Sequence, residues 1–327
     1  MSDLKVPKIS VVVTCYNCRS YVGDAIRSVA RQTLRGLECV IVDDASTDDS
    51  LAVIRAVLEE LSDTRFAVLR LDANLGQTGA SRAGLGRTNA PFVCFLDADD
   101  VWNENFLERH LAAHMNETCA AGFTACNARV IDGDGALIAG TVYWFGRDRA
   151  ESERDQEFVA LDAARVPVVD PDKGVVWQGR TSFRLYTKRS LQWVWVSTSS
   201  MMFRRSLVDL VFPDDDEAFR LHMDFCLVIM AQMAAGSLLI DEPLYAYRLH
   251  GRNLAASNPV LGGRLHLSPR DLKETYDEML DRMLGVMVRD RQRFTAALGP
   301  YQYDQMVLAM RAARPASLFA RLFGHRT

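Results

Sequence analysis

The chain has 327 residues, of which 49% are hydrophobic and 24% charged. This composition indicates a globular protein with one large α/β domain and an appendage, or with two domains. A formal net charge of −4 argues against a general nucleic-acid binder, so no nucleic-acid partner is expected. Seven cysteines without framework spacing argue against a disulfide scaffold. With no signal peptide and no apolar run long enough to span a bilayer, the sequence predicts a cytoplasmic protein.

The first hundred residues alternate between apolar runs and helical patterns. Ile9 to Thr14 is a β-branched run typical of a central parallel strand, and a helical pattern begins at Tyr21. Further strands are expected at 38–42, 66–71 and 92–96, with a loop at 74–79 and a helix at 80–87. Another helix is expected after an N-cap at Ser46 or Thr47, with Leu51, Ile54, Leu58 and Leu61 on its core side. This alternation predicts a parallel sheet with helices on both faces, in which ligands bind beyond the carboxyl ends of the strands.

Three of the expected strands end in polar side chains. These are Thr14 and Tyr16 after the first strand, Asp43 and Asp44 after the second, and Asp97 and Asp99 after the fourth. In a parallel sheet these ends share one edge, so the side chains are expected to line a common crevice. The alternative is that they only cap the helices that follow, as Ser46 or Thr47 is expected to do.

Asp97, Asp99 and Asp100 bring three carboxylates within four positions, directly after a buried strand. Such carboxylates repel one another unless a cation lies between them, and hard oxygen ligands suit Mg2+ or Mn2+. The chain has neither a GxGxxG fingerprint after the first strand nor a P-loop, so a metal is the natural means of holding a diphosphate. We therefore predict a nucleoside-diphosphate site. The alternative is an acidic turn that caps a helix beginning at Asn103 or Glu104.

Four segments in this half follow one another in a known order and spacing. They are VVVTCYN at 11–17, VDDASTD at 42–48, NLG at 74–76 with Ser81 and Arg82, and LDADD at 96–100. In them the chain resembles the nucleotide-binding half of a family 2 glycosyltransferase. The resemblance implies the GT-A fold, an α/β fold with a Rossmann-like, mostly parallel central sheet and helices on both faces.

The resemblance also implies roles for the residues at these strand ends. By it, Thr14, Tyr16 and Asp44 contact the base and ribose, with Asp43 beside them. Arg82 faces the base or the phosphates, and Asp97 and Ala98 lie at the ribose or sugar. Asp99 of the DXD motif binds the divalent metal. Because surface helices carry arginine routinely, a solvated Arg82 is the alternative.

Beyond Asp100 the pattern is looser. A helix is expected at 103–115 and a hairpin at 120–138. Residues 141–195 lack clear periodicity, and we interpret them as an insertion that shapes the acceptor side. The tryptophans of this region either stack on sugar rings or fill the core; they are Trp144, Trp177, Trp193 and Trp195.

A second chemical stretch starts with an expected strand at 196–205 and leads to Asp224, in the first turn of a long helix. A carboxylate is electrostatically favoured at a helix N-terminus, so capping is one explanation of Asp224. The resemblance implies a catalytic carboxylate here, usually as Glu-Asp, and Met223 departs from that pattern. We predict that Asp224 is the catalytic base, with Asp215 and Glu217 as alternatives.

The segment Tyr247-Arg248-Leu249-His250 follows an expected strand at 238–240. By the resemblance, such a sequence ends the catalytic domain near the donor phosphates. Arg248 and His250 are therefore expected to neutralise the diphosphate, and His250 also to reach the metal. An ordinary hydrogen-bonded histidine is the alternative, and residues 255–268 are expected to form a mobile loop.

These patterns predict a catalytic domain at 1–255, with a nucleotide-binding half at 1–100 and an acceptor-side half at 101–255, and a helical C-terminal extension at 256–327. Helices of the extension are expected at 272–293, 301–313 and 316–323. Seven arginines against two aspartates from residue 289 onward give this end a charge of +5. Its helices either pack against the body or a second subunit of a homo-oligomer, or contact an anionic membrane peripherally.

The predicted reaction moves a sugar from a UDP-, dTDP- or GDP-sugar to a hydroxyl of a glycan, glycolipid or other cell-surface polysaccharide precursor, with a glycan or lipid-linked molecule as acceptor. One base in line with the leaving group, Asp224, predicts inversion at the anomeric carbon, with Mn2+ or Mg2+ as cofactor. One alternative is a sugar-phosphate nucleotidyltransferase, although residues 15–20 lack the glycine-rich basic loop it needs. The other is a non-catalytic nucleotide-sugar binding module.

Overall fold

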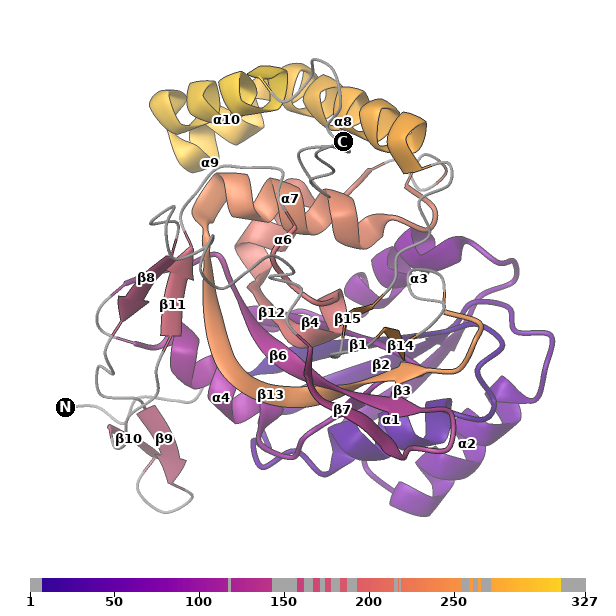
Figure 1. The fold of residues 1–327 in the computed structure, drawn as a ribbon. Helices are drawn as coiled ribbons and strands as arrows, with labels where there is room; N and C mark the ends of the chain where they lie inside the picture. Colours follow the sequence, from indigo (N-terminus) through magenta and orange to yellow (C-terminus); the bar gives the residue numbers. More distant parts are fainter. Residues whose placement is uncertain are drawn as a thin grey trace.

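The structure is a computed structural model. It describes residues 8–116, 119–142, 158–161, 167–170, 174–177, 183–186, 193–214, 217, 219–253, 259–260, 264–265 and 272–312. Within them, one eleven-stranded sheet runs through the molecule with helices on both of its faces (Figure 1).

The strands of this sheet follow the order β3-β2-β1-β4-β12-β6-β13-β11-β8, with β7 beside β6 and β5 beside β13. Their bounds are β1 Ile9–Cys15, β2 Leu37–Asp43, β3 Phe66–Arg70, β4 Phe92–Asp97, β5 Val101–Trp102, β6 Phe123–Asp132, β7 Leu137–Val142, β8 Phe158–Leu161, β11 Phe183–Tyr186, β12 Met201–Arg204 and β13 Ser237–Leu249. Strands β3, β2, β1 and β4 are parallel, as are β6 and β13, whereas β12 runs antiparallel between β4 and β6. The expected α/β class is confirmed, and β12 joins a parallel first half to a mixed second half.

Three valines explain why β1 lies at the centre of the molecule. Val12 belongs to the hydrophobic core on one side of the sheet, and Val11 and Val13 belong to the core on the other. A strand that is buried on both faces requires a continuous apolar run rather than an alternating one. One face is covered by α1 (Val22–Ala30), α2 (Ser50–Leu61) and α4 (Phe106–His114), the other by α3 (Gly76–Leu85), α6 (Arg205–Val211) and α7 (Met223–Ala235) (Figure 1).

The C-terminal helices form an outer layer against α7 (Figure 1). They are α8 (Leu272–Arg289), α9 (Arg291–Leu298) and α10 (Pro300–Ala312). Met279, Met283 and Met287 recur on the face of α8 that is buried in this core, where Phe294 of α9 joins them. The expected helical extension is therefore present and packs against the body, while the helix expected at 316–323 lies outside the described residues. In the described part of the chain, no helix is both long and apolar enough to cross a bilayer.

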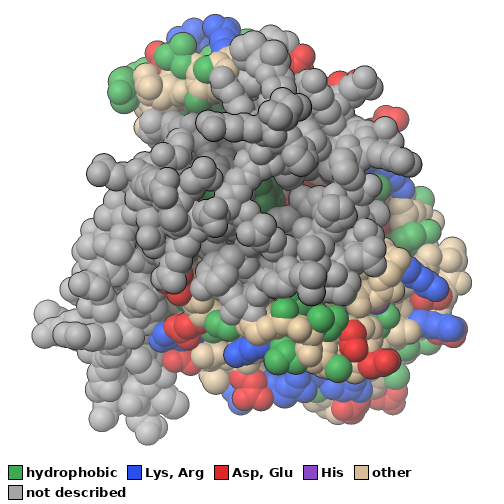
Figure 2. All heavy atoms as spheres, in the orientation of Figure 1, with side chains coloured by type: hydrophobic (Ala, Val, Ile, Leu, Met, Phe, Trp, Pro, Cys, Tyr) green, Lys and Arg blue, Asp and Glu red, His purple; other side chains and the backbone are tan. Residues whose placement is uncertain are grey.

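Acidic and basic side chains are interspersed over α1 and α2 on the face shown in Figure 2. Arg27 on α1 pairs with Glu60 on α2, with 2.6 Å between the nitrogen and the oxygen. Both side chains are well exposed, so the pair contributes little to the free energy of unfolding.

The acceptor-side half contains the expected hairpin, formed by β6 and β7. Inside the region 141–195, β8 and β11 extend the main sheet, and β9 (Pro167–Asp170) pairs with β10 (Gly174–Trp177). A further short pair is β14 (Pro259–Val260) with β15 (Arg264–Leu265). Trp195 is buried, and its ring contacts the rings of Phe123 and Tyr186, so this tryptophan fills the core. Neither Trp144 nor the side chain of Trp177 is among the described parts.

Several element boundaries differ from the expected ones. α2 begins at Ser50 rather than after Ser46, because the 46–48 segment is held in a loop by other side chains. α3 begins at Gly76, inside the expected loop. β13 has 13 residues and ends at Leu249, just before the histidine of the Tyr-Arg-x-His sequence, with register shifts at Pro243 that let the strand pass a residue with no N–H.

Candidate active site

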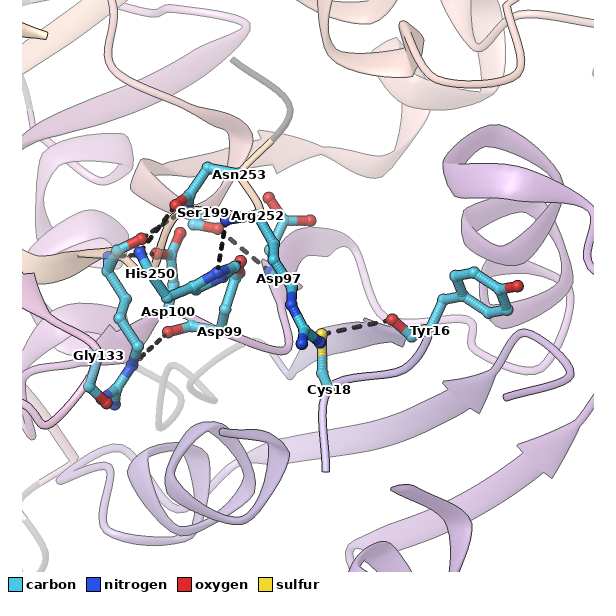
Figure 3. Close-up of polar contacts among 11 residues, drawn as sticks. Tyr16, Cys18, Asp97, Asp99, Asp100, Gly133, Ser199, His250, Arg252 and Asn253 are labelled. Atoms are coloured by element: carbon cyan, nitrogen blue, oxygen red, sulfur yellow. Dashed lines mark hydrogen bonds and ion pairs between the residues drawn. The ribbon is translucent and has the colours of Figure 1, made fainter. Parts of the chain in front are cut away.

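The tips of β1, β2 and β4 are joined by backbone hydrogen bonds. Ala98 donates its N–H to the carbonyl of Thr14 at 3.2 Å, and Asp44 donates its N–H to the carbonyl of Cys15 at 2.8 Å. The three strand ends therefore lie at one edge of the sheet, as expected. Thr14 is partly buried there, whereas Tyr16 is 47% exposed and points away from the acidic residues (Figure 3).

Asn17 organises the loop after β2, a role that the sequence analysis missed. Its backbone has a φ of +53°, a left-handed conformation that asparagine tolerates better than most residues. Its side-chain oxygen accepts N–H bonds from Thr47 at 2.8 Å and Asp48 at 3.3 Å, and its own N–H donates to Ser46 Oγ at 3.0 Å. The Tyr16-Asn17 sequence could have signalled this turn, but not its partner 30 residues away.

Asp43 and Asp44 are buried at the tip of β2. One oxygen of Asp43 accepts the N–H of Ser46 at 3.3 Å, and Arg70 lies 3.9 Å from the other. Both oxygens of Asp44 accept backbone N–H groups, from Leu75 at 2.7 Å and Gly76 at 2.8 Å. Burial raises the pKa of Asp44, while these two bonds oppose the shift. The predicted base and ribose contact of Asp44 would thus compete with its bonds to the 74–76 loop.

The acidic cluster comprises Asp97, Asp99 and Asp100, which follow β4 (Figure 3). Burial raises the pKa of Asp97 to about 7, and the charges of Asp99 and then Asp224 add to this shift. Burial, followed by the charges of Asp99 and Asp97, raises the pKa of Asp100, whose Oδ2 is buried with no hydrogen-bond partner among the described residues. Asp97 therefore lies within electrostatic range of both Asp99 and Asp224.

Ser199 supports the cluster from the second half of the molecule and was not anticipated. It lies in a 3-10 turn, Thr198–Ser200, where a continuous strand was expected. Its Oγ accepts the N–H of Asp97 at 3.2 Å, and its carbonyl accepts the indole N–H of Trp102 at 2.7 Å.

His250 contacts Asp99 directly. Its Nε2 lies 2.9 Å from Asp99 Oδ2, and its Nδ1 accepts the N–H of Arg252 at 3.3 Å. An Nδ1 that accepts must be unprotonated in the neutral ring, so Nε2 donates to Asp99. The imidazole also stacks on Tyr21, with 4.8 Å between ring centroids and 17° between planes. His250 thus points Nε2 at the predicted metal ligand, and metal binding by this nitrogen would require the ring proton to move to Nδ1 in place of the bond from Arg252.

Arg248 is 3% exposed and serves the scaffold of the site. Its Nε donates to the carbonyl of Asp99 at 2.9 Å, Nη1 to the carbonyl of Gly133 at 3.2 Å, and Nη2 to Asp24 at 3.0 Å. The guanidinium carbon lies 5.0 Å from the ring centroid of Tyr21. Each guanidinium nitrogen already donates one bond within the protein, and the predicted phosphate contact stays a prediction.

Asp224 lies in the first turn of α7, between the buried residues Met223 and Phe225. Its Oδ1 accepts the N–H of Phe225 at 2.7 Å. Burial raises its pKa, and the bond from Phe225 opposes the shift. Of the two alternative bases, Glu217 is exposed and Asp215 lies outside the described residues.

The loop at 74–76 connects the two sides of the site. Arg220 donates to the carbonyl of Asn74 at 2.7 Å and also contacts its side chain. Thr78 donates to the carbonyl of Phe219 at 2.5 Å. Gly76, with a φ of +74°, leaves no room for a side chain, because a Cβ would come within 2.7 Å of the Arg220 carbonyl. The segment before α7 is therefore fixed to the nucleotide half.

Arg82 on α3 points toward the second half. Its guanidinium donates to the carbonyl of Pro213 and lies 5.3 Å from the ring centroid of Phe212. Its predicted contact with the base or phosphates remains a prediction.

The residues at Asp99 fit a metal that is completed by substrate. Within the described residues, no three His, Cys, Asp or Glu side chains converge as a metal site. Mg2+ and related ions are commonly held by one or two carboxylates together with substrate phosphates and water. The unpartnered Asp100 oxygen and the mutually repelling carboxylates show a local excess of negative charge that such an ion would neutralise.

Related proteins of known sequence are glycosyltransferases. The chain is 31% identical to an uncharacterized glycosyltransferase of Nostoc sp. over 75% of this chain and 66% of that protein. It is 36% identical to the putative teichuronic acid biosynthesis glycosyltransferase TuaG of Bacillus subtilis over 39% of this chain and 50% of that protein. It is 28% identical to the Escherichia coli UDP-Glc:alpha-D-GlcNAc-diphosphoundecaprenol beta-1,3-glucosyltransferase WfaP over 36% of this chain and 45% of that protein. The matched part thus spans from under half to about two thirds of these relatives.

Two solved structures share the fold at low sequence identity. The Staphylococcus aureus TarS fragment 1–349 in complex with UDP has a TM-score of 0.52 and 16% identity, over 98% of this chain and 75% of that chain. The mannosyltransferase PcManGT of Pyrobaculum calidifontis, in complex with GDP-Man and Mn2+, has a TM-score of 0.50 and 14% identity, over 99% of this chain and 82% of that chain. The expected GT-A fold is thereby confirmed. Residues 10–212 match the model of glycosyl transferase family 2, to which the chain therefore belongs.

Proposed function

We propose that the protein is an inverting glycosyltransferase that moves a sugar from a nucleoside-diphosphate sugar to an acceptor hydroxyl, with Asp224 as base. The observation that carries the proposal is a chain of contacts: the loop at 74–76 bonds to Asp44 at the tip of β2, and residues 74–78 also bond to Phe219 and Arg220, just before Asp224. The strand ends and the start of α7 are thereby held together, and they are proposed to act on one donor.

The nucleotide is proposed to lie over the tips of β1, β2 and β4. Thr14, Tyr16 and the 43–44 pair would contact base and ribose, and Asp97 with Ala98 the ribose or sugar. UDP and GDP-Man are bound by the two structural neighbours, so a UDP-, dTDP- or GDP-sugar is the proposed donor.

Asp224 is proposed to take the proton of the attacking hydroxyl. Burial raises its pKa, which strengthens it as a proton acceptor while the carboxylate stays anchored by the Phe225 N–H. With a single base opposite the leaving diphosphate, the displacement proceeds in one step with inversion.

Asp99 and His250 are the residues proposed to hold a divalent ion, Mn2+ or Mg2+. When bound, such an ion supplies charge neutralisation for the leaving diphosphate. Arg248 fixes the Asp99 backbone, and Tyr21 fixes the His250 ring, so the chain itself sets the orientation of both ligands.

The proposed acceptor is a lipid-linked or cell-surface glycan precursor, because the relatives include a teichuronic acid biosynthesis enzyme and one named for a GlcNAc-diphosphoundecaprenol. A cytoplasmic location, peripheral membrane contact through the basic C-terminal helices and a homo-oligomer stay predictions.

The test is turnover of UDP-Glc, UDP-GlcNAc and GDP-Man with Mn2+, with GlcNAc-diphosphoundecaprenol or water as acceptor. Wild-type protein is expected to release the nucleoside diphosphate from one donor. Asp224→Asn should lower this rate more than about 100-fold while nucleotide affinity changes only a few-fold. Glu217→Gln, an exposed carboxylate in the same segment, is the matched control and should stay near wild type.

Undiminished turnover in Asp224→Asn would contradict the base assignment. Binding without turnover of any donor would favour a non-catalytic module. Formation of a nucleotide sugar from a nucleoside triphosphate and a sugar phosphate would favour a nucleotidyltransferase.

A further inference from the structure

Three arginines around the candidate site donate hydrogen bonds to other groups of the protein. Arg248 bonds to the carbonyls of Asp99 and Gly133. Arg220 bonds to Asn74, and Arg82 bonds to the carbonyl of Pro213. These side chains hold together the segments around the candidate site.

Arg252 differs from them in exposure and in partners. Its side chain is exposed, and its guanidinium makes no hydrogen bond or ion pair with the residues that the structure describes. Its backbone is well held, because its N–H donates to His250 Nδ1 at 3.3 Å. Gly251, with a φ of +75°, makes the turn that separates Arg252 from the end of β13.

Neighbouring bonds fix this turn against the acidic cluster. Asn253 accepts the N–H of His250 at 2.9 Å and donates to the carbonyl of Arg248 at 2.7 Å. His250 in turn bonds to Asp99. The position of the Arg252 backbone is thus coupled to the proposed metal ligand through two hydrogen bonds.

The Arg252 side chain extends into the same region as Asp99. Figure 3 shows it pointing from its turn toward Cys18. A bond from Cys15, burial and then the charge of Asp99 raise the pKa of Cys18, so Cys18 lies within electrostatic range of Asp99. The guanidinium is exposed to solvent, and in Figure 3 it is drawn on the side of the acidic cluster that faces Cys18.

We propose that Arg252 binds the diphosphate of the donor, while the buried Arg248 only supports the site. This rests on the proposed function. A diphosphate beside Asp99 needs a cation on the side that the metal does not cover, and an arginine fork matches phosphate oxygens. Among the four arginines described above, Arg252 is the one whose guanidinium makes no hydrogen bond or ion pair with the residues that the structure describes.

The experiment measures the affinity of UDP and GDP by calorimetry in the presence of Mn2+, with uridine and guanosine as phosphate-free probes. Arg252→Ala should weaken binding of the preferred diphosphate about tenfold, as expected for one charge-assisted contact. It should leave nucleoside affinity and the midpoint of urea unfolding unchanged. Arg252→Lys should recover part of the loss, since it keeps the charge and loses the fork.

Arg311→Ala, an exposed arginine of α10, makes the same change in net charge and should leave diphosphate affinity unchanged. Wild-type diphosphate affinity in Arg252→Ala would overturn the inference, as would an equal loss in Arg311→Ala. Failure of the wild-type protein to bind either diphosphate would instead count against the proposed function.

Discussion

The nucleotide side and the α7 side of the candidate site hold their carboxylates in different ways. On the nucleotide side, Asp44 accepts N–H groups from a loop about 30 residues away, and Asp99 is bonded to His250, 151 residues away. On the α7 side, the hydrogen bond described for Asp224 comes from Phe225, its neighbour in the chain. Carboxylates of the first kind support both fold and binding, whereas Asp224 can lose its charge with little effect on the fold. Substitutions on the two sides should therefore separate binding and stability from chemistry.

The largest effect on the nucleotide side is expected from Asp99→Ala. It removes the proposed metal ligand and leaves His250 without its partner. The Mn2+-dependent nucleotide affinity should fall at least about 100-fold. Removing a residue that only supports a metal ligand already lowers metal affinity about ten- to 100-fold, and Asp99 is proposed as a ligand itself. Calorimetry with and without Mn2+ measures this. Asp304→Ala on α10 is the control, and an unchanged Mn2+ dependence in Asp99→Ala would exclude Asp99 as a ligand.

Arg248→Met should lower the free energy of unfolding by about 3 kcal/mol, because two partly buried carbonyls and the carboxylate of Asp24 lose a charged donor. Urea unfolding measures the loss. Arg252→Ala provides the contrast, since it should affect affinity and not stability. Equal stability of Arg248→Met and wild type would show that Arg248 does not support the site.

A comparison of β1 and the acidic cluster with Arg248 shows which features the sequence can predict. The β-branched run of β1 and the carboxylates after β4 were predictable, because each depends on local composition and on which edge parallel strands share. The partners of Arg248 were not, because the carbonyls of Asp99 and Gly133 are 149 and 115 residues away in the chain. The length of β13 was hidden for a similar reason, since Glu242-Pro243 interrupts its apolar pattern and the strand passes it through register shifts.

Gly76→Ala tests the connection between the two sides. The new Cβ would come within 2.5 Å of Arg220 Cγ, and the φ of +74° disfavours a side chain. We expect a loss of about 2 kcal/mol in the free energy of unfolding, together with weaker nucleotide binding. Gly36→Ala, where a Cβ meets nothing within 4 Å, is the control. Equal unfolding midpoints for the two variants would show that the loop tolerates movement.

The smallest expected effect concerns a buried histidine of the fold rather than the candidate site. Burial lowers the pKa of His114 on α4 to about 3, so the folded protein keeps this ring neutral. The unfolded chain takes up the proton below about pH 6.5, so this site lowers stability as the pH falls from 6.5 toward 3 and has no effect above. Replacing it in His114→Gln should reduce the slope of unfolding free energy against pH by up to about 1.4 kcal/mol per unit between pH 6 and 4. An unchanged slope in urea titrations would contradict the neutral buried ring.

Paramagnetic broadening of the Asp224 carboxyl signal by Mn2+ is the most direct test of whether the proposed metal ligand and the proposed base lie at one site. The experiment uses protein with carbon-13 in its aspartate carboxyls, in the presence of the preferred nucleoside diphosphate. Loss of one signal in Asp224→Asn assigns the resonance. Mn2+ should broaden that resonance in wild-type protein but not in Asp99→Ala. A sharp Asp224 signal while Mn2+ and the nucleotide are bound would contradict the claim that the metal ligand and the base act on the same donor.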